Sequence, residues 1–361
     1  MKILIIYAAA GAGHKKAAEA LFHYLKENTS HEIVFADVLD YTQPLYKKNY
    51  EKTYVFCVTK APWLWGFFFA LTDCAFCRPF VRFFRRAANS VNAKLFEEFL
   101  VKEQFDAVFS THFFPNEVIS YLKKKGLIRS KLVSIVTDFD VHSMWMASGV
   151  DCYTAASLYT KEKLIHLGVA PEKVFTTGIP THAKFSTPVD KRELCNKLGI
   201  KENLFTVLIA TGSFGIGPIE ELVGGLSTFQ LLVVCGNNKT LFKELSVRQN
   251  ELLKVYGLVD NMDELMSVVD VMITKPGGLS ISEAMVKNLP LIFFSAIPGQ
   301  ETSNIKVLKS YGIGAWTPSV AEIIKEVENL NTSAKTLQNA KENTRRLAKP
   351  AACRDIASLI G

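Results

Sequence analysis

Residues 271–284 read V-M-I-T-K-P-G-G-L-S-I-S-E-A. The first four residues predict a short buried strand, Pro276 and the two glycines after it predict a tight turn, and the remaining residues suit a helix. A strand that leads through a glycine turn directly into a helix is the repeating unit of parallel α/β sheets. This stretch therefore predicts the α/β fold class.

The alternation of strand and helix continues on both sides of this stretch and occurs in two series. K-I-L-I-I-Y at residue 2 opens the first series, and F-T-V-L-I-A at residue 205 opens the second. A polar segment near residues 186–190 separates them. Because 361 residues exceed one ordinary core, we expect an N-terminal domain over residues 1–187, a C-terminal domain over 188–334, and a cleft between them.

Composition indicates a chain that is folded throughout and that functions in a reducing compartment. Apolar residues make up 48% and charged residues 21%, as in ordinary globular proteins. A strand begins at Lys2, so we expect no secretion signal before it. Seven scattered cysteines fit free thiols in the cytosol. Cys74 and Cys77 lack a second pair at metal-ligand spacing, so we expect plain thiols and no metal site.

The positive charge is concentrated in one aromatic insertion. The net charge is +7, and residues 44–102 hold ten Lys or Arg against four acids. Basic side chains around aromatic rings are typical of a helix that lies on an anionic membrane. The apolar run over 61–71 is far shorter than the roughly 20 residues that span a bilayer. The residues expected to meet the membrane surface include Trp63, Trp65, Phe68, Arg78, Arg82, Arg85 and Arg86.

Two other interpretations of this insertion remain open from the sequence. One is a buried helical hairpin with a basic rim. The other is nucleic-acid binding, which ranks lowest because the pattern is confined to one apolar insertion. We therefore expect no nucleic-acid partner.

Two motifs in the first series carry groups suited to catalysis. Gly11, Gly13 and His14 lie between a strand and a helix, where the backbone suits a phosphate or a developing anion and the imidazole can accept a proton. Asp138 and His142 follow the strand K-L-V-S-I-V, where they could orient a sugar or a hydroxyl. The alternatives are a structural turn at 11–14 and a helix cap at Asp138 beside a packed His142.

Two motifs in the second series suit a nucleotide-sugar donor. Residues 211–218, T-G-S-F-G-I-G-P, offer backbone N–H groups to a diphosphate, but they do not form a Walker loop. The stretch at 271–284 offers a glycine turn and a carboxylate that can accept both ribose hydroxyls, although an ordinary turn with a surface Glu is the alternative. The predicted donor-binding residues are Gly13, Gly212, Ser213, Lys275, Gly277, Gly278, Leu279, Ser280, Glu283, Gln300, Glu301 and Asn304.

These four motifs, in this order, resemble the monogalactosyldiacylglycerol synthase and processive diacylglycerol glucosyltransferase family, which is related to the peptidoglycan enzyme that adds N-acetylglucosamine to lipid I. The resemblance covers most of the chain. It includes the Gly-x-Gly-His turn, T-D-x-x-x-H-x-x-W at 137–145, Y-G-L-V-D-N-M-D-E-L at 256–265, I-T-K-P-G-G-L-S-I-S-E-A-M at 273–285 and P-G-Q-E-T-S-N at 298–304.

The resemblance implies a GT-B fold, in which two Rossmann-like domains face each other across a cleft. The first domain would take a lipid acceptor such as diacylglycerol, the second would bind UDP-glucose or UDP-galactose, and the C-terminal helix over 335–361 would pack back on the first. The enzyme would invert the anomeric centre with no cofactor and no obligatory metal, and it would lie peripherally on the cytoplasmic face of the membrane.

The resemblance also implies roles for individual residues. His14 would be the base, while Asp138 and His142 would shape the acceptor pocket, where Trp145 also lies. Glu283 would hold the ribose. Gly277 and Gly278 would contact the phosphates, and Gln300 and Glu301 the hexose.

The chain departs from the family pattern mainly outside 274–304. Ala147 stands where relatives often carry a second His, no Arg closely follows Pro180, and Ser213 and Phe214 loosen the glycine-rich turn. These departures concern the acceptor more than the donor nucleotide. The alternatives are therefore a GT-B enzyme with a non-lipid acceptor, a UDP-sugar epimerase, or a non-catalytic UDP-sugar-binding protein.

Overall fold

A computed structural model describes residues 1–9, 11–77, 80–81, 85 and 92–361. Arg78, Arg82 and Arg86, which were expected to meet the membrane, lie outside the described residues. The chain divides into two compact units. The first comprises Met1–Ala183, Ile297–Gln300 and Ala351–Gly361, and the second comprises Lys184–Ala296 and Glu301–Pro350. The expected boundary after residue 187 falls close to the observed one after 183.

The first unit is built on a parallel sheet with the strand order β2-β1-β3-β4-β5-β6. The chain moves from β1 outward to β2 and then returns to β3 on the other side of β1, so the strand order reverses between β1 and β3. The strands are β1 (Lys2–Tyr7), β2 (Glu32–Asp37), β3 (Ala107–Ser110), β4 (Lys131–Ile135), β5 (Cys152–Thr154) and β6 (Val174–Phe175).

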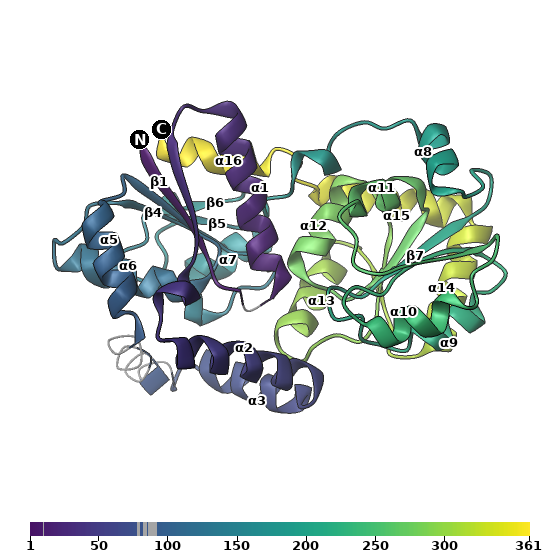
Figure 1. Ribbon diagram of the computed structural model, residues 1–361, viewed down its shortest axis with the longest axis horizontal. Coiled ribbons are helices and arrows are strands. Elements are labelled where there is room, and N and C mark those ends of the chain that lie inside the picture. The colour runs from purple at the N-terminus through teal and green to yellow at the C-terminus, as the bar shows by residue number, and fades with distance from the viewer. Residues whose placement is uncertain (10, 78–79, 82–84, 86–91) are drawn as a thin grey trace. The chain divides into compact units, whose positions relative to one another are not determined.

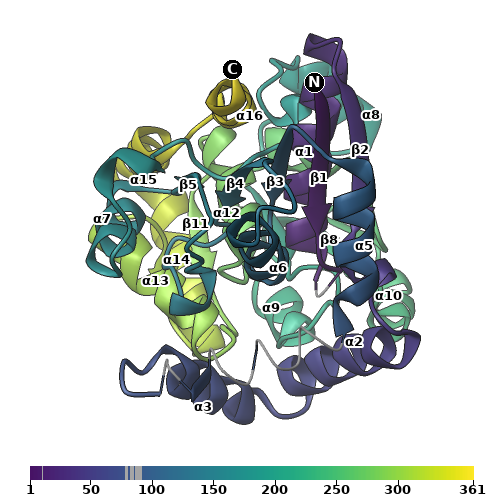
Figure 2. The ribbon, with the colours of Figure 1, turned by 90° about the vertical axis from the view of Figure 1, so that its left-hand side faces the viewer.

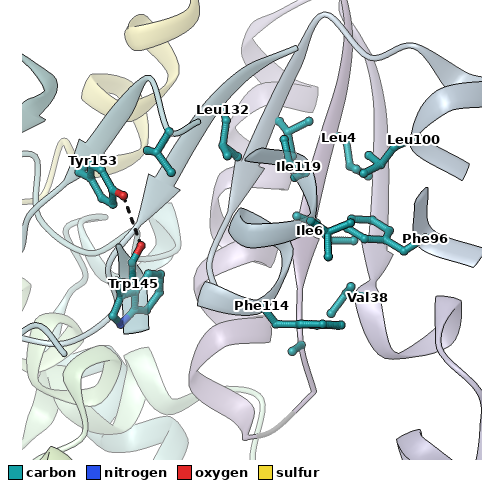
Figure 3. Close-up of a cluster of buried hydrophobic side chains, with 14 of the residues drawn as sticks. Leu4, Ile6, Val38, Phe96, Leu100, Phe114, Ile119, Leu132, Trp145 and Tyr153 are labelled. Atoms are coloured by element: carbon teal, nitrogen blue, oxygen red, sulfur yellow. Dashed lines mark hydrogen bonds between the residues drawn. The ribbon is translucent and has the colours of Figure 1, made fainter. Parts of the chain in front are cut away.

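Helices cover both faces of this sheet because successive side chains of a strand point to opposite faces. Leu4 and Ile6 of β1 pack in one core cluster with Phe96 of α5 and Ile119 of α6 (Figure 3). Figure 2 shows these two helices in front of the sheet. Ile5 packs on the other face, in a cluster with residues of α1 and α16. The helices are α1 (Ala12–Asn28), α2 (Pro44–Thr59), α3 (Pro62–Asp73), α5 (Lys94–Glu103), α6 (Phe113–Lys124), α7 (Leu158–His166) and α16 (Ala352–Ala357), with short 3-10 helices at η1 (Val38–Tyr41), η2 (Ser143–Trp145), η3 (Pro171–Lys173) and η5 (Ser358–Ile360).

The aromatic insertion begins with two helices, α2 and α3, each started by a proline in its first turn. No residue of α3 is buried. Among the described residues, no single helix is long and apolar enough to span a membrane. In this described part of the chain, α2 and α3 taken together, with a bend of 110° between them, are the one pair that reaches that length and composition.

The second unit repeats the plan of helices around a parallel sheet (Figure 1). Its strand order is β12-β11-β10-β7-β8-β9. Here the strand order reverses between β7 and β10. The strands are β7 (Thr206–Ala210), β8 (Gln230–Val234), β9 (Leu253–Tyr256), β10 (Val271–Thr274), β11 (Leu291–Phe293) and β12 (Ala315–Trp316). The helices are α8 (Lys191–Leu198), α9 (Ile219–Gly225), α10 (Lys239–Ser246), α11 (Met262–Val268), α12 (Gly278–Val286), α13 (Gln300–Ser310), α14 (Val320–Thr332) and α15 (Ala334–Leu347), and η4 (Ala183–Phe185) lies at the unit boundary.

The C-terminal segment differs from the single returning helix expected over 335–361. Helix α15 belongs to the second unit, where Leu337 and Ala340 pack against the core, and only residues 351–361 belong to the first. The break has a local cause, because Pro350 disfavours helical geometry at the residue before it. After the break, α16 lies beside α1 (Figure 1) and buries Cys353 and Ile356 in the first unit.

Candidate functional site

His14 lies where the strand order of the first sheet reverses, which is the place where open α/β sheets bind ligands. It stands in the first turn of α1, directly after β1, and the loop that follows β3 approaches it. His14 Nδ1 donates to the carbonyl oxygen of Thr111 at 2.6 Å, and the Thr137 hydroxyl lies 3.1 Å from the same nitrogen. A carbonyl oxygen only accepts hydrogen bonds, so the ring proton is on Nδ1 and the lone pair is on Nε2. This is the tautomer that a general base requires.

Burial lowers the pKa of His14 to about 4, although the hydrogen bond to Thr111 opposes the shift. The imidazole is therefore neutral at physiological pH and its Nε2 can accept a proton. The low pKa makes it a weaker base than free imidazole, but it keeps nearly every molecule in the reactive protonation state.

We expect kcat/KM to stay flat as the pH falls from 7 to about 5 and to fall about tenfold per unit below about pH 4, because kcat/KM reports the pKa of the free enzyme. The same shift destabilises the fold as the pH falls from about 6.5 to about 4, because the unfolded chain binds the proton first. Circular dichroism at each pH separates the two effects. An acid limb near pH 6.5 in a folded protein would contradict the assignment.

Sequence reasoning missed two neighbours of His14. Thr111 and His112 follow β3 directly, and the Thr111 hydroxyl also donates to the main-chain carbonyl of His14 at 3.0 Å. The His112 ring is buried beside the His14 ring, with 4.9 Å between centroids. Their position after a strand was the available signal, since the same criterion singled out Asp138.

Asp138 is buried directly beyond the end of β4, and its carboxylate accepts a hydrogen bond from Gln300 Nε2 at 2.8 Å within the first unit. The structure thus brings together one predicted catalytic residue and one predicted donor-binding residue. Glu301, the next residue, belongs to the second unit.

His142 uses both ring nitrogens in hydrogen bonds that hold the insertion in place. Its Nδ1 accepts from the Met144 N–H at 3.0 Å, and its Nε2 donates to the Phe69 carbonyl of α3 at 2.9 Å. Beside it, Asp73 at the end of α3 accepts from the Ser143 N–H at 2.8 Å. Burial would raise the pKa of Asp73, but this hydrogen bond and nearby His142 hold the pKa below its usual range. His142 therefore anchors α3 to the loop after β4, and this geometry gives it no free nitrogen to act as a base.

The residues predicted to meet the membrane or the acceptor separate into two groups. Trp63 is 71% exposed and Phe68 is 50% exposed, and Trp65 is partly exposed. Arg85 instead forms an ion pair with Glu117, with 2.5 Å between Nε and the carboxylate, and its guanidinium donates to the Met144 carbonyl. Trp145 is buried in the core, where its carbonyl accepts from the Tyr153 hydroxyl (Figure 3). Arg85 and Trp145 are therefore engaged inside the unit and do not extend the exposed aromatic face.

In the second unit, Gly212 and Ser213 lie in the turn after β7, at the reversal of strand order. The turn requires glycine, since Gly212 has φ +78° and Gly215 has φ +57°. The Ser213 carbonyl accepts from the Asn237 N–H at 2.9 Å, and the Asn238 amide donates to the Gly215 carbonyl at 3.0 Å. The loop after β8 therefore braces the predicted diphosphate turn.

Residues 275–278 follow β10, whose Thr274 pairs in register with Ala210 of β7. The glycine turns at 211–218 and 275–278 therefore begin at the ends of neighbouring strands. The first turn of α12 presents the N–H groups of Gly278, Leu279 and Ser280 ahead of its first main-chain bond, from Ile281 N–H to the Gly277 carbonyl. This helix N-terminus favours an anion.

Other predicted donor residues surround this turn. Burial lowers the pKa of Lys275, opposed by Glu301. Glu283 is half-buried on α12. Asn304 is fully buried, and its amide donates to the Pro276 carbonyl at 3.0 Å, so it braces the turn from behind. Within the described part of the chain, no three His, Cys, Asp or Glu side chains are grouped closely enough to hold a metal ion.

Comparison with known sequences identifies relatives over the whole chain. The family described as monogalactosyldiacylglycerol (MGDG) synthase matches residues 14–181, and the glycosyltransferase family 28 C-terminal domain matches residues 206–356. A processive diacylglycerol beta-glucosyltransferase of Bacillus pumilus (strain SAFR-032) is 30% identical over 354 residues, covering 96% of this chain and 91% of that protein. A protein of the same name from Bacillus cereus (strain G9842) is 30% identical over 356 residues, covering 97% and 90%.

Among solved structures, MurG of Acinetobacter baumannii has a similar fold, with a TM-score of 0.62 and 15% identity over 100% of this chain and 99% of that one. Anabaena HepE in complex with UDP has a TM-score of 0.59 and 14% identity, covering 99% of both chains. At these identities the similarity concerns the fold alone.

Proposed function

Because this chain belongs to the monogalactosyldiacylglycerol synthase family, within glycosyltransferase family 28, and has the GT-B fold, we propose that it transfers a hexose from a UDP-sugar to the hydroxyl of diacylglycerol. The proposal is supported by relatives over almost the full length whose names carry this activity. The observation that carries it is the tautomer of His14, whose Nε2 lone pair lies at the ligand-binding edge of the first sheet. UDP-glucose and UDP-galactose both fit the proposal.

In the proposed reaction, His14 Nε2 takes the proton of the acceptor hydroxyl as its oxygen forms a bond to the anomeric carbon. The bond between that carbon and the UDP oxygen breaks, and the configuration inverts. The N–H groups at the start of α12 and the glycine turn after β7 stabilise the charge that develops on the diphosphate. Glu283 would hold the ribose, and Gln300 and Glu301 the hexose. Because these backbone N–H groups stabilise the charge on the diphosphate, the proposed reaction needs no metal and no cofactor.

Because the proposed acceptor is a lipid, it has to reach the site from a membrane. The outer face of α3 exposes Trp63, Phe67 and Leu71 at intervals of four residues, and Phe68 lies beside them. Side chains three to four residues apart share one face of a helix. We propose that this face enters the headgroup region and that the protein is peripheral on the cytoplasmic side of the membrane.

The function is tested by incubating the protein with phosphatidylglycerol-containing vesicles, diacylglycerol and labelled UDP-glucose or UDP-galactose, with and without EDTA. We expect label in the lipid fraction in both conditions, and mass spectrometry identifies the product. Epimerised but water-soluble label would indicate an epimerase. Transfer to a water-soluble acceptor alone would indicate another acceptor class, and binding of UDP without turnover would indicate a non-catalytic protein. Loss of transfer in EDTA would contradict the metal-free mechanism.

The triple change Trp63→Ser, Phe67→Ser and Phe68→Ser is expected to weaken vesicle binding by about a hundredfold, because each ring loses on the order of 1 kcal/mol of interfacial burial. Affinity for UDP stays unchanged. Vesicle flotation measures the binding. The control is Val247→Ser with Leu258→Ser, two exposed apolar side chains of the second unit, which leaves binding intact. Equal losses in both variants would show that the α3 face has no special part in membrane contact.

A further inference from the structure

A second imidazole packs against the candidate base. His112 follows β3 and is 2% exposed, and its ring meets the His14 ring edge to face at an interplanar angle of 82°. Aromatic rings prefer this arrangement over a parallel stack because the ring edge is positive and the ring face is negative. The contact therefore depends on the orientation of both rings.

His112 is itself held in one orientation by the helix that it begins. Its Nδ1 accepts a hydrogen bond from the Phe114 N–H at 3.2 Å and caps α6. Because Nδ1 accepts, the proton of the neutral ring is on Nε2. The Phe113 ring lies at 4.1 Å from it, between centroids. Rotation of the His112 ring would break the cap, so α6 holds the ring in place.

Two consecutive residues thus make three contacts with His14. The Thr111 carbonyl accepts from Nδ1, the Thr111 hydroxyl donates to the His14 carbonyl, and the His112 ring packs against the His14 ring. The first contact selects the tautomer, and the second fixes the main chain. The Thr111 contacts leave the ring able to tilt about the Nδ1 bond, and the His112 contact opposes this tilt.

We propose that His112 is a positioning residue for the transfer reaction, which holds the ring plane of His14 so that Nε2 faces the acceptor hydroxyl. It acts through His14 and does not touch the substrate. The inference rests on the proposed role of His14 as the base. Burial, and to a lesser degree the nearby His14, holds the pKa of His112 well below its usual range, so the supporting ring is neutral. A neutral support adds no charge that would repel the proton arriving at His14.

Two variants separate the ring contact from the helix cap. His112→Asn keeps a capping oxygen at the start of α6 but removes the ring. His112→Phe keeps a ring but removes the cap. We expect the Asn variant to retain its melting temperature and its affinity for UDP while kcat falls about tenfold or more, because a small displacement of a catalytic group is costly. We expect the Phe variant to melt at a lower temperature but to retain more of kcat than the Asn variant.

A second measurement needs no turnover. In ¹⁵N NMR of the imidazole groups, wild-type His14 is expected to show the Nδ1–H tautomer. The Asn variant is expected to keep this tautomer, because the Thr111 carbonyl is unchanged, but to show an acid transition at higher pH, because water replaces the ring. Unchanged His14 signals in the Asn variant, or wild-type kcat and pH profile, would overturn the proposal. So would a folded Phe variant as slow as the Asn variant. Absence of transfer by the wild type would instead contradict the proposed function, and the NMR result would still report on the contact.

Discussion

Replacement of His14 by alanine is expected to lower kcat by about 100-fold to 10,000-fold, the range that general-base catalysis contributes. The change removes the nitrogen that receives the acceptor proton, while the donor motifs at 211–218 and 275–283 lie in the second unit. Affinity for UDP is therefore expected to change by less than about twofold, so that the loss appears in turnover and not in donor binding. Initial rates in mixed vesicles and calorimetric titration with UDP measure the two quantities.

The matched control for this variant is His23→Ala, which removes an imidazole from the same helix. His23 is exposed on α1, and its ring lies 5.3 Å from the His182 ring, between centroids. We expect wild-type kcat in this variant. If His14→Ala kept more than about a tenth of kcat, another group would be the base, and Asp138 would be the next residue to change.

Replacement of Gly215 by alanine is expected to disrupt the turn after β7 and to weaken UDP binding by about tenfold or more. At φ +57°, a side chain strains the backbone by about 1 to 2 kcal/mol. An added Cβ would also lie 2.2 Å from the Cys235 carbonyl oxygen. That atom is main chain, so relief requires movement of the loop after β8 that braces the turn. The destabilisation of the fold is expected to reach about 3 kcal/mol.

Gly212→Ala separates the clash from the backbone strain. Gly212 has a similar φ of +78°, but apart from its own chain neighbours no atom lies within 4 Å of the position its Cβ would occupy. We expect the fold of this variant to lose only the strain energy, about 1 to 2 kcal/mol. Thermal melting and UDP titration of both variants provide the comparison. Equal effects would mean that the contact with Cys235 is relieved at little cost.

The architecture could be predicted from local patterns because each α/β unit is recognisable in a short segment of the sequence. The strand V-M-I-T and the glycine turn after it predicted β10 and α12, and the restart at residue 205 predicted a second α/β domain. The C-terminal segment could not be divided in the same way. Pro350 marks a break within 335–361, but only the packing of Leu337 on the second core and of Ile356 on the first assigns the two parts to different units.

The sequence predicted individual residues of the candidate site, but not the contacts that they make with residues far away in the chain. The position of His14 after a strand identified it, but its tautomer depends on a carbonyl at residue 111. The partner of His142 Nε2 is the carbonyl of Phe69, more than seventy residues away, and no spacing rule reaches that far. Trp145 was predicted for the acceptor pocket from its motif at 137–145, and the sequence did not show that it is buried beside Tyr153. The roles assigned to the donor-binding residues stay predictions.

The return of residues 351–361 to the first unit has a consequence for biosynthesis. Cys353, Ile356 and Ile360 pack with Ile3 and Ile5 of β1 on one face of the first sheet, so a strand synthesised before the second unit shares a core with residues synthesised after it. The second unit can complete its core as soon as residue 350 has emerged from the ribosome. The unit that carries His14 lacks part of the core on one face of its sheet until residue 360 has emerged. The nascent protein would thus complete the core of its donor-binding unit before the core of the unit that carries His14.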